Sequence, residues 1–229
     1  MAVADNLLEL LKEIPSSVSL VAVSKFKPAE DIMAAYAAGQ RRFGENRPQE
    51  LAAKAAALPA DIEWHFIGHL QTNKIKFVLP YASLIESVDS LHLLQAIDEW
   101  GGNNGKVIDV LLELHIGAED TKQGFVEEEI LDLLFTVANS LKPDGTHSKY
   151  PNINFRGLMG MASHTDDEET IRADFSRISQ FLDYLRDLFP ELPAFDQLSI
   201  GMSSDWPFAL DYGATIIRVG TAIFGERQY

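Results

Sequence analysis

The sequence has 229 residues, a formal net charge of −15 and 46% hydrophobic residues. This length fits one large α/β domain, and the hydrophobic content is sufficient for a full core. The acidic balance excludes the basic surface that nucleic-acid binding needs, and it argues equally against binding to anionic membranes. The chain contains no cysteine, which excludes disulfides, thiolate catalysis and cysteine-ligated metals.

The N-terminal segment MAVADNLLELLKEIP predicts an amphipathic helix over about residues 5–13. The segment carries acidic residues and lacks the basic start and apolar centre of a signal peptide. No apolar run in the sequence approaches the length of a membrane span. We therefore expect a soluble, cytoplasmic protein.

Short apolar runs rich in β-branched residues alternate with helical patterns along the rest of the chain. We expect eight strands, at residues 19–25, 41–46, 63–68, 84–89, 106–116, 154–162, 197–203 and 215–225. Pro28 and Pro48 each begin one of the intervening helices. An open doubly wound sheet is the alternative, but no G-x-G-x-x-G turn follows the first strand. The pattern therefore predicts an α/β fold, a single (β/α)8 TIM barrel over residues 1–229 with an extra N-terminal helix.

The segment NSLKPDGTHSKYPNIN, residues 139–154, breaks this rhythm. It is polar, rich in turn residues and long for a barrel connection. It joins the fifth barrel helix to the sixth strand, so we expect a surface insertion at the bottom face, away from any chemistry.

Two lysines follow the first strand, and in a barrel the functional residues collect where strands end. Lys25 and Lys27 share strand parity, so alternation does not distinguish them. Lys27 directly precedes Pro28 and is expected to turn towards the helix, whereas Lys25 still points over the barrel mouth. An amine in a partly apolar mouth is a nucleophile. The alternative is a lysine whose stem is buried and whose ammonium group is solvated.

Small and hydroxylic residues follow the seventh and eighth strands. Ser203 and Ser204 precede a short helix expected at about residues 205–212, and Gly220 and Thr221 follow the eighth strand. Backbone N–H groups at such positions bind phosphate, and barrels often hold phosphates in these two loops. An ordinary helix cap with packing glycines is the alternative. An imine-forming lysine beside a phosphate site indicates pyridoxal 5'-phosphate (PLP).

Other kinds of catalytic site lack their motifs. His115 and His164 could face the mouth but have no matching carboxylate cluster, and neither H-E-x-x-H nor G-x-S-x-G occurs. We therefore expect no metal site and no nucleophilic serine.

Six motifs occur in order from the first strand to the eighth: AVSKFKP, FGENRPQE, WHFIGHLQTNK, RGLMGM, LSIGMSSDW and IIRVGTAIFG. With them the chain resembles the pyridoxal phosphate homeostasis proteins, the single-domain relatives of the alanine racemase N-terminal barrel (fold-type III). This resemblance covers nearly the whole chain. It implies that Lys25 carries PLP as a Schiff base, an internal aldimine.

The resemblance also implies the other cofactor-binding residues. Ser203, Gly220 and Thr221 would contact the phosphate, with Ser204 as a weaker candidate. Arg218 would approach the pyridine nitrogen and Asn46 would line the pocket. The chain departs from the family at Arg47 and Pro48, where an aromatic and an aliphatic residue are usual, and the 139–154 insertion is also not typical.

Three functions are compatible with a PLP lysine in a barrel. The first is a carrier that holds PLP for homeostasis and delivers it to PLP-dependent apo-enzymes, with no catalytic residues of its own. The second is a racemase or decarboxylase of the alanine racemase type, which needs a second, mostly β domain for which a chain ending at Tyr229 has no room. The third is an aldolase using Lys25 on a phosphorylated sugar, although such lysines generally lie on a later strand. We expect the carrier, as a monomer or weak dimer.

Overall fold

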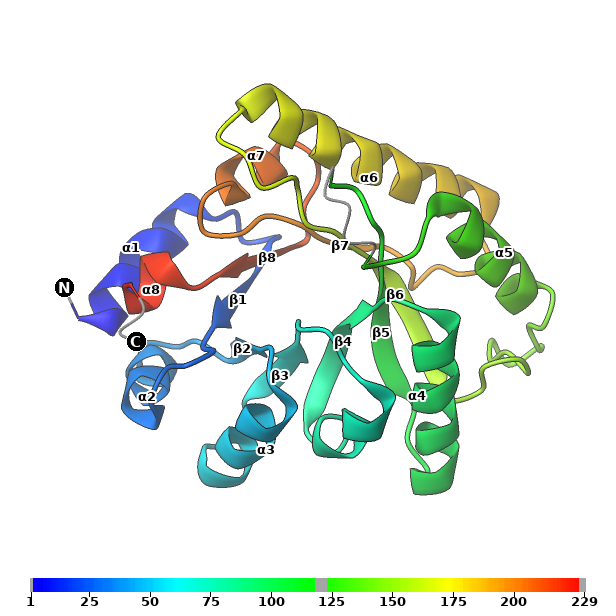
Figure 1. The fold of residues 1–229 in the computed structure, drawn as a ribbon, viewed down its shortest axis with the longest axis horizontal. Helices are drawn as coiled ribbons and strands as arrows, with labels where there is room; N and C mark the ends of the chain where they lie inside the picture. The colour runs from blue at the N-terminus through cyan, green and yellow to red at the C-terminus, as the bar shows by residue number, and fades with distance from the viewer. Residues whose placement is uncertain (1, 118–122, 227–229) are drawn as a thin grey trace.

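Eight parallel strands close into a barrel in the computed structural model, which describes residues 2–117 and 123–226 (Figure 1). Each strand pairs with the next, and β8 pairs with β1. The strands are β1 (Ser19–Val23), β2 (Arg42–Glu45), β3 (Glu63–Phe66), β4 (Ala82–Val88), β5 (Ile108–Glu113), β6 (Ile153–Met159), β7 (Gln197–Ser199) and β8 (Ile216–Val219). The barrel predicted from the sequence is confirmed.

Helices connect the strands around the outside of the barrel (Figure 1). They are α1 (Val3–Glu13), α2 (Ala29–Ala37), α3 (Pro48–Ala57), the 3₁₀ helix η1 (Thr72–Phe77), α4 (Leu91–Asn104), α5 (Glu127–Ala138), α6 (Glu168–Leu188), α7 (Trp206–Leu210) and α8 (Thr221–Phe224). The expected N-terminal helix is α1, which packs beside α8, and the Asn6 side-chain amide donates to the carbonyl of Ile223 at 3.0 Å. The chain's first and last helices therefore support each other.

The expectation of a strand continuing through residues 221–225 was wrong. Gly220 ends β8, and residues Thr221–Phe224 form helix α8. The backbone N–H groups of Gly220 and Thr221 turn away from the strand ladder and donate to the Ser203 hydroxyl. An apolar run of four residues fits a strand and a buried helical turn equally well, so the sequence pattern did not separate them.

Two layers of side chains pack against the strands. Outward-facing apolar residues pack against the helices in one large core, in which Phe43, Leu51 and Phe175 are fully buried. A smaller cluster of inward-facing residues fills the barrel interior: Val21, Leu84, Leu111, Met159 and Ile216. This separation follows from the alternation of side chains along each strand. The interior also holds the charged residues Glu86 and Arg218, both buried.

The 139–154 segment joins α5 to the start of β6, as expected, but it is not wholly a surface insertion. Leu141 and His147 form an antiparallel bridge, and the Lys142 amide donates to the Thr146 carbonyl at 2.7 Å. The rings of His147 and Tyr150 are buried against Phe155. The second half of the segment therefore covers the barrel wall. No helix in the described part of the chain is long and apolar enough to cross a membrane.

The joint between β6 and β7 depends on the absence of a side chain at Gly157. A Cβ atom there would lie 1.9 Å from the Gln197 carbonyl oxygen. Gly157→Ala should lower the free energy of unfolding by about 3 kcal/mol or more, because neither strand can move without opening the barrel. Gly105 also has a positive φ, but its Cβ would meet no described atom within 4 Å. Gly105→Ala should therefore cost only about 1 kcal/mol of left-handed strain. Equal losses in urea unfolding would contradict this account.

Candidate functional site

Lys25 lies half-buried in a tight turn at the end of β1. The turn is closed by the Lys27 amide, which donates to the Ser24 carbonyl at 3.0 Å. Phe26 has φ of +63°, an uncommon conformation for a residue with a side chain. The backbone therefore stops the strand abruptly at the carboxyl-end rim of the barrel.

A cluster of charged residues from β2 and α3, of which Glu45 is buried and Glu50 and Lys54 are half-buried, holds this turn. The Lys54 ammonium group donates to the Ser24 carbonyl at 2.8 Å and to Glu45 and Glu50 at 2.7 Å each. The Ser24 hydroxyl donates to Glu45 at 2.6 Å, and the Phe26 amide donates to Glu50 at 2.7 Å. Each of these three Lys54 hydrogen bonds thus holds either the turn itself or a carboxylate that accepts a hydrogen bond from the turn. The sequence analysis missed this cluster, although Glu50 and Lys54 stand four apart on one helix and could have indicated a pair.

Burial raises the pKa of Glu45, while the charge and hydrogen bond of Lys54 and the hydrogen bond of Ser24 act to lower it. Glu45 is fully buried, so its partners decide whether it is tolerated. The Lys54 cluster is therefore a structural support for the residue that the turn carries, Lys25.

The Lys27 side chain contacts the end of helix α8. Its ammonium group donates to the carbonyls of Phe224, Gly225 and Glu226, at 2.9, 3.1 and 3.2 Å. These are the carbonyls at the C-terminal end of α8, where a cation is favourable. Lys27 thus caps α8, whereas the sequence analysis expected it to turn towards the helix that Pro28 begins. Lys25 is the other lysine of this turn and lies at the end of β1.

The loops after β7 and β8 meet at Ser203. Its hydroxyl oxygen accepts from the backbone N–H groups of Gly220 at 3.0 Å and Thr221 at 3.2 Å. A Cβ atom on Gly220 would lie 3.1 Å from the carbonyl oxygen of Val23, directly before the Lys25 turn. Three of the predicted phosphate-site residues are therefore brought together beside the end of β1. Ser204 is exposed and lies instead on the wall of the neighbouring cavity.

Asn46 follows β2, on the same rim. The end of β3 approaches it so closely that a Cβ atom on Gly68 would lie 2.4 Å from the Asn46 carbonyl oxygen. The side-chain Oδ1 of Asn46 is buried and has no hydrogen-bond partner among the described residues. Such an acceptor indicates a place for a ligand group or a water molecule. Next to it, the Arg47 guanidinium stacks on the exposed Phe26 ring at 4.3 Å, so the unusual residue pair after FGEN shapes the rim.

Arg218 projects into the barrel from β8 and is 4% exposed. Its guanidinium donates to the Ser199 carbonyl at 2.9 Å, to the Ser199 hydroxyl at 2.5 Å and to the Gly160 carbonyl at 3.0 Å. Glu86 lies 3.7 Å away. Burial lowers the pKa of Arg218, and Glu86, Glu113 and Asp205 act to raise it. Arginine nevertheless stays protonated in proteins, so the interior of this barrel holds a fixed positive charge.

Glu86 is the fully buried counter-charge of Arg218. It accepts from His65 Nδ1 at 2.6 Å and from the Ser199 hydroxyl at 2.5 Å. Burial acts to raise the pKa of Glu86, but the hydrogen bond from His65 and the charges of His65 and Arg218 bring it below its usual value. The sequence analysis did not assign a role to Glu86, His65 or Ser199.

A cavity of about 270 Å³ opens at the mouth between the ends of β5, β6 and β7. Glu113, Met161 and Ser204 are among its lining residues. Burial, followed by the charge of Asp89, raises the pKa of Glu113 to about 7. The mouth therefore contains a carboxyl group that is partly protonated at neutral pH, and the sequence analysis also missed this residue.

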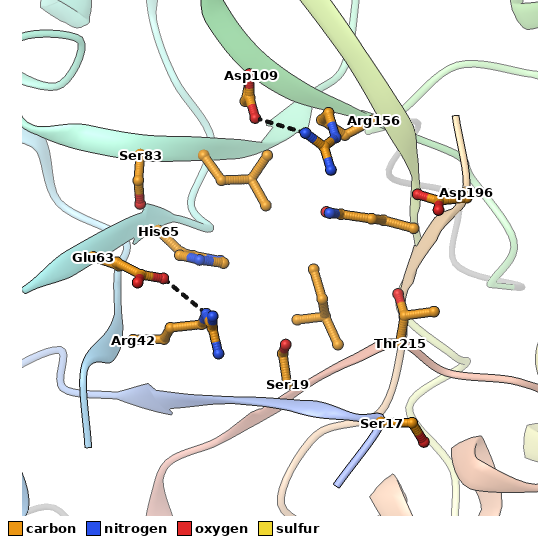
Figure 2. Close-up of a pocket in the computed structure, with 13 residues that line it drawn as sticks. Ser17, Ser19, Arg42, Glu63, His65, Ser83, Asp109, Arg156, Asp196 and Thr215 are labelled. Atoms are coloured by element: carbon orange, nitrogen blue, oxygen red, sulfur yellow. Dashed lines mark hydrogen bonds and ion pairs between the residues drawn. The ribbon is translucent and has the colours of Figure 1, made fainter. Parts of the chain in front are cut away.

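A larger cavity, of about 430 Å³, lies at the opposite end of the barrel, where the strands begin (Figure 2). Arg42 pairs there with Glu63 at 2.8 Å and Arg156 with Asp109 at 3.3 Å, and the His65 ring enters the cavity from β3. In barrels of this kind the functional residues lie at the carboxyl ends of the strands. This favours the mouth as the functional site, although the cavity there is smaller. Among the residues that the structure describes, no group of three histidine, aspartate or glutamate side chains could hold a metal ion.

Comparison with known proteins shows which family the chain belongs to. The family model "Alanine racemase, N-terminal domain" matches residues 1–228. The chain is 41% identical over 212 residues to the pyridoxal phosphate homeostasis protein of Aquifex aeolicus, covering 92% of this chain and 87% of that protein. It is 37% identical over 220 residues to the protein of the same name from Vibrio alginolyticus, covering 94% and 89%.

Solved structures show the same relationship. PipY of Synechococcus elongatus PCC7942, solved without PLP, superposes with a TM-score of 0.89 at 37% identity, over 97% of this chain and all of that chain. The same protein with PLP bound gives 0.85. Alanine racemase from E. faecalis shares only 16% identity, with a TM-score of 0.68 over 58% of its length, so it shows the fold alone. The chain belongs to the family of the alanine racemase N-terminal domain and, within it, to the pyridoxal phosphate homeostasis proteins.

Proposed function

We propose that this chain binds PLP at the barrel mouth, holds it through Lys25 and takes part in PLP homeostasis. The observation that carries the proposal is the meeting of three features at one rim: Lys25 at the end of β1, the N–H groups of Gly220 and Thr221, and the Arg218 guanidinium beneath them. The PLP-bound structure of PipY, at 37% identity, supports it.

The residues present fit this cofactor. PLP supplies an aldehyde carbon and an electron-withdrawing ring when it is bound. Lys25 would contribute the amine nitrogen that bonds the aldehyde carbon, with release of water. The backbone N–H groups of Gly220 and Thr221, which donate to the Ser203 hydroxyl in this structure, would donate to phosphate oxygens in its place. The unpartnered Oδ1 of Asn46 would face the ligand.

We further propose that the chain is a carrier, acting as a monomer or weak dimer, rather than a strong catalyst. The names of its relatives describe homeostasis. Arg218 only donates hydrogen bonds. Against the pyridine nitrogen it would keep that nitrogen unprotonated and the ring a weaker electron sink. Glu113, whose pKa is raised to about 7, is the observation that favours the racemase or decarboxylase alternative, because it could exchange protons at the mouth.

Lys25 should be the residue that becomes covalently modified. Reduction of the PLP-loaded protein with borohydride followed by peptide mapping should place the pyridoxyl group on Lys25, because Lys27 is engaged at the end of α8. Lys27→Ala is the matched control, and it should keep the modification while lowering stability by about 1 kcal/mol through loss of the cap. Modification mainly at Lys27, or at Lys122, which lies outside the described residues, would overturn the assignment.

Gly220 should matter more for affinity than the hydroxyl of Thr221. Gly220→Val places a side chain against Val23 and in the space where phosphate would approach, so its Kd for PLP should rise about tenfold or more. Thr221→Ala keeps both backbone N–H groups and should change Kd less than about threefold. Equilibrium dialysis gives the affinities, and urea unfolding checks that both variants are folded. Unchanged affinity in both folded variants would refute this phosphate site.

The carrier proposal also predicts weak turnover. Amino-acid racemisation and decarboxylation should stay at the level of free PLP, because proton transfer by a placed acid or base, worth about 10²–10⁴-fold, is not expected to operate. The loaded protein should nevertheless restore activity to a PLP-dependent apo-enzyme. Robust racemisation that is lost in both Lys25→Ala and Glu113→Gln would instead support the enzyme alternative.

A further inference from the structure

A line of buried polar contacts crosses the barrel interior beneath the proposed site. Arg218 Nη1 donates to the Ser199 hydroxyl, which donates to Glu86 Oε2. Glu86 Oε1 accepts from Nδ1 of His65 on the next strand. The four residues come from β8, β7, β4 and β3, and none is more than 5% exposed. Figure 2 shows the far end of this line, where the His65 ring reaches the cavity at the opposite end of the barrel.

Burying these charged groups in the barrel interior costs free energy. An ion pair in a protein interior loses much hydration free energy, and a well-packed apolar replacement is often as stable or more stable. The residues Val21, Leu84 and Leu111, which pack in the same interior, are aliphatic, and the buried Glu113 lies towards the mouth. Packing alone therefore does not explain four polar side chains at the centre of the barrel.

The contacts fix the direction of the Arg218 guanidinium. Hydrogen bonds to Ser199 and Gly160 use three of its five N–H groups. The two others, on Nε and Nη2, have no partner among the described residues. The Ser199 hydroxyl accepts from Arg218 and donates its own proton to Glu86, and Glu86 in turn is oriented by His65. Glu86 is therefore linked to the guanidinium through Ser199 as well as by its charge 3.7 Å away.

We propose that Glu86 is a positioning residue, which acts through Ser199 and is anchored by His65 to aim the free N–H groups of Arg218 at the ring nitrogen of the bound cofactor. This inference rests on the proposed function. Glu86 itself does not touch the cofactor, and its effect passes through the guanidinium. Loss of the Glu86 contacts should therefore weaken the binding only of a ligand that has a ring nitrogen.

Glu86→Gln tests the proposal with little change of shape. Both carboxylate oxygens now accept hydrogen bonds, whereas an amide presents one acceptor and one donor group, so the hydrogen bond with either His65 or Ser199 would have to reverse its direction. The guanidinium would also lose the counter-charge 3.7 Å away. Ser199→Ala removes the bridge and keeps both charges, which provides a second variant if Glu86→Gln does not fold. Ser87→Ala is the matched control, since this equally buried hydroxyl bonds the Gly68 carbonyl instead.

The measurement is the Kd of each protein for two ligands, PLP and an analogue with a C–H group in place of the ring nitrogen. Glu86→Gln and Ser199→Ala should each weaken PLP binding about tenfold and binding of the analogue less than about twofold. Ser87→Ala should change neither. The visible absorption maximum of bound PLP should shift in the two test variants and stay in place in the control.

The other outcomes would contradict either the positioning role of Glu86 or the proposed function. Equal losses for both ligands, or no loss for either, would overturn the positioning role. A wild-type protein that binds both ligands equally would overturn it as well, because Arg218 would then not recognise the ring nitrogen, although the Lys25 attachment would stand. A wild-type protein that binds neither ligand would contradict the proposed function itself.

Discussion

The buried guanidinium of Arg218 is the constraint on which the arrangement of the barrel interior depends. A permanent positive charge at 4% exposure requires acceptors and a counter-charge. The structure provides them from three other strands or their ends, through Ser199, Gly160 and Glu86. These partners are in place only when β4, β6, β7 and β8 are in register. The charge at the centre of the barrel therefore depends on the closed barrel.

A second polar cluster, around Lys54, holds the turn that carries Lys25. Lys54, Glu45 and Glu50 fix the Ser24–Lys27 turn from the side of β2 and α3. Lys27 and the α1–α8 contact fix α8, whose first N–H groups meet Ser203. The amine, the proposed phosphate-binding groups and the guanidinium are thus supported by separate contacts on rigid elements. Such support from surrounding residues is what a binding site needs to hold a ligand in one geometry.

Much of this arrangement could be predicted from the sequence, since it depends on local rules. The alternation of strands and helices predicted the barrel. The proline after Lys27 predicted a side chain turned towards the following helix, and the Lys27 ammonium group instead contacts the end of α8. The pairing of Glu86 with His65 and Ser199 could not be predicted in the same way, because the partners lie 21 and 113 residues away in the chain. The sequence does show that Glu86 is a charged residue in an apolar strand, at a position whose side chain points into the barrel, and the same is true of Glu113. The boundary between β8 and α8 was missed because a hydroxyl 17 residues away decides it.

The central claim is that Lys25 and the adjoining N–H groups form one cofactor site, and spectrophotometric titration of the purified chain with PLP tests it most directly. The account predicts a visible absorption band that saturates at one equivalent of PLP, weakens when inorganic phosphate competes, and is absent in Lys25→Ala. A band that keeps growing without saturation, or one that persists unchanged in Lys25→Ala, would contradict it.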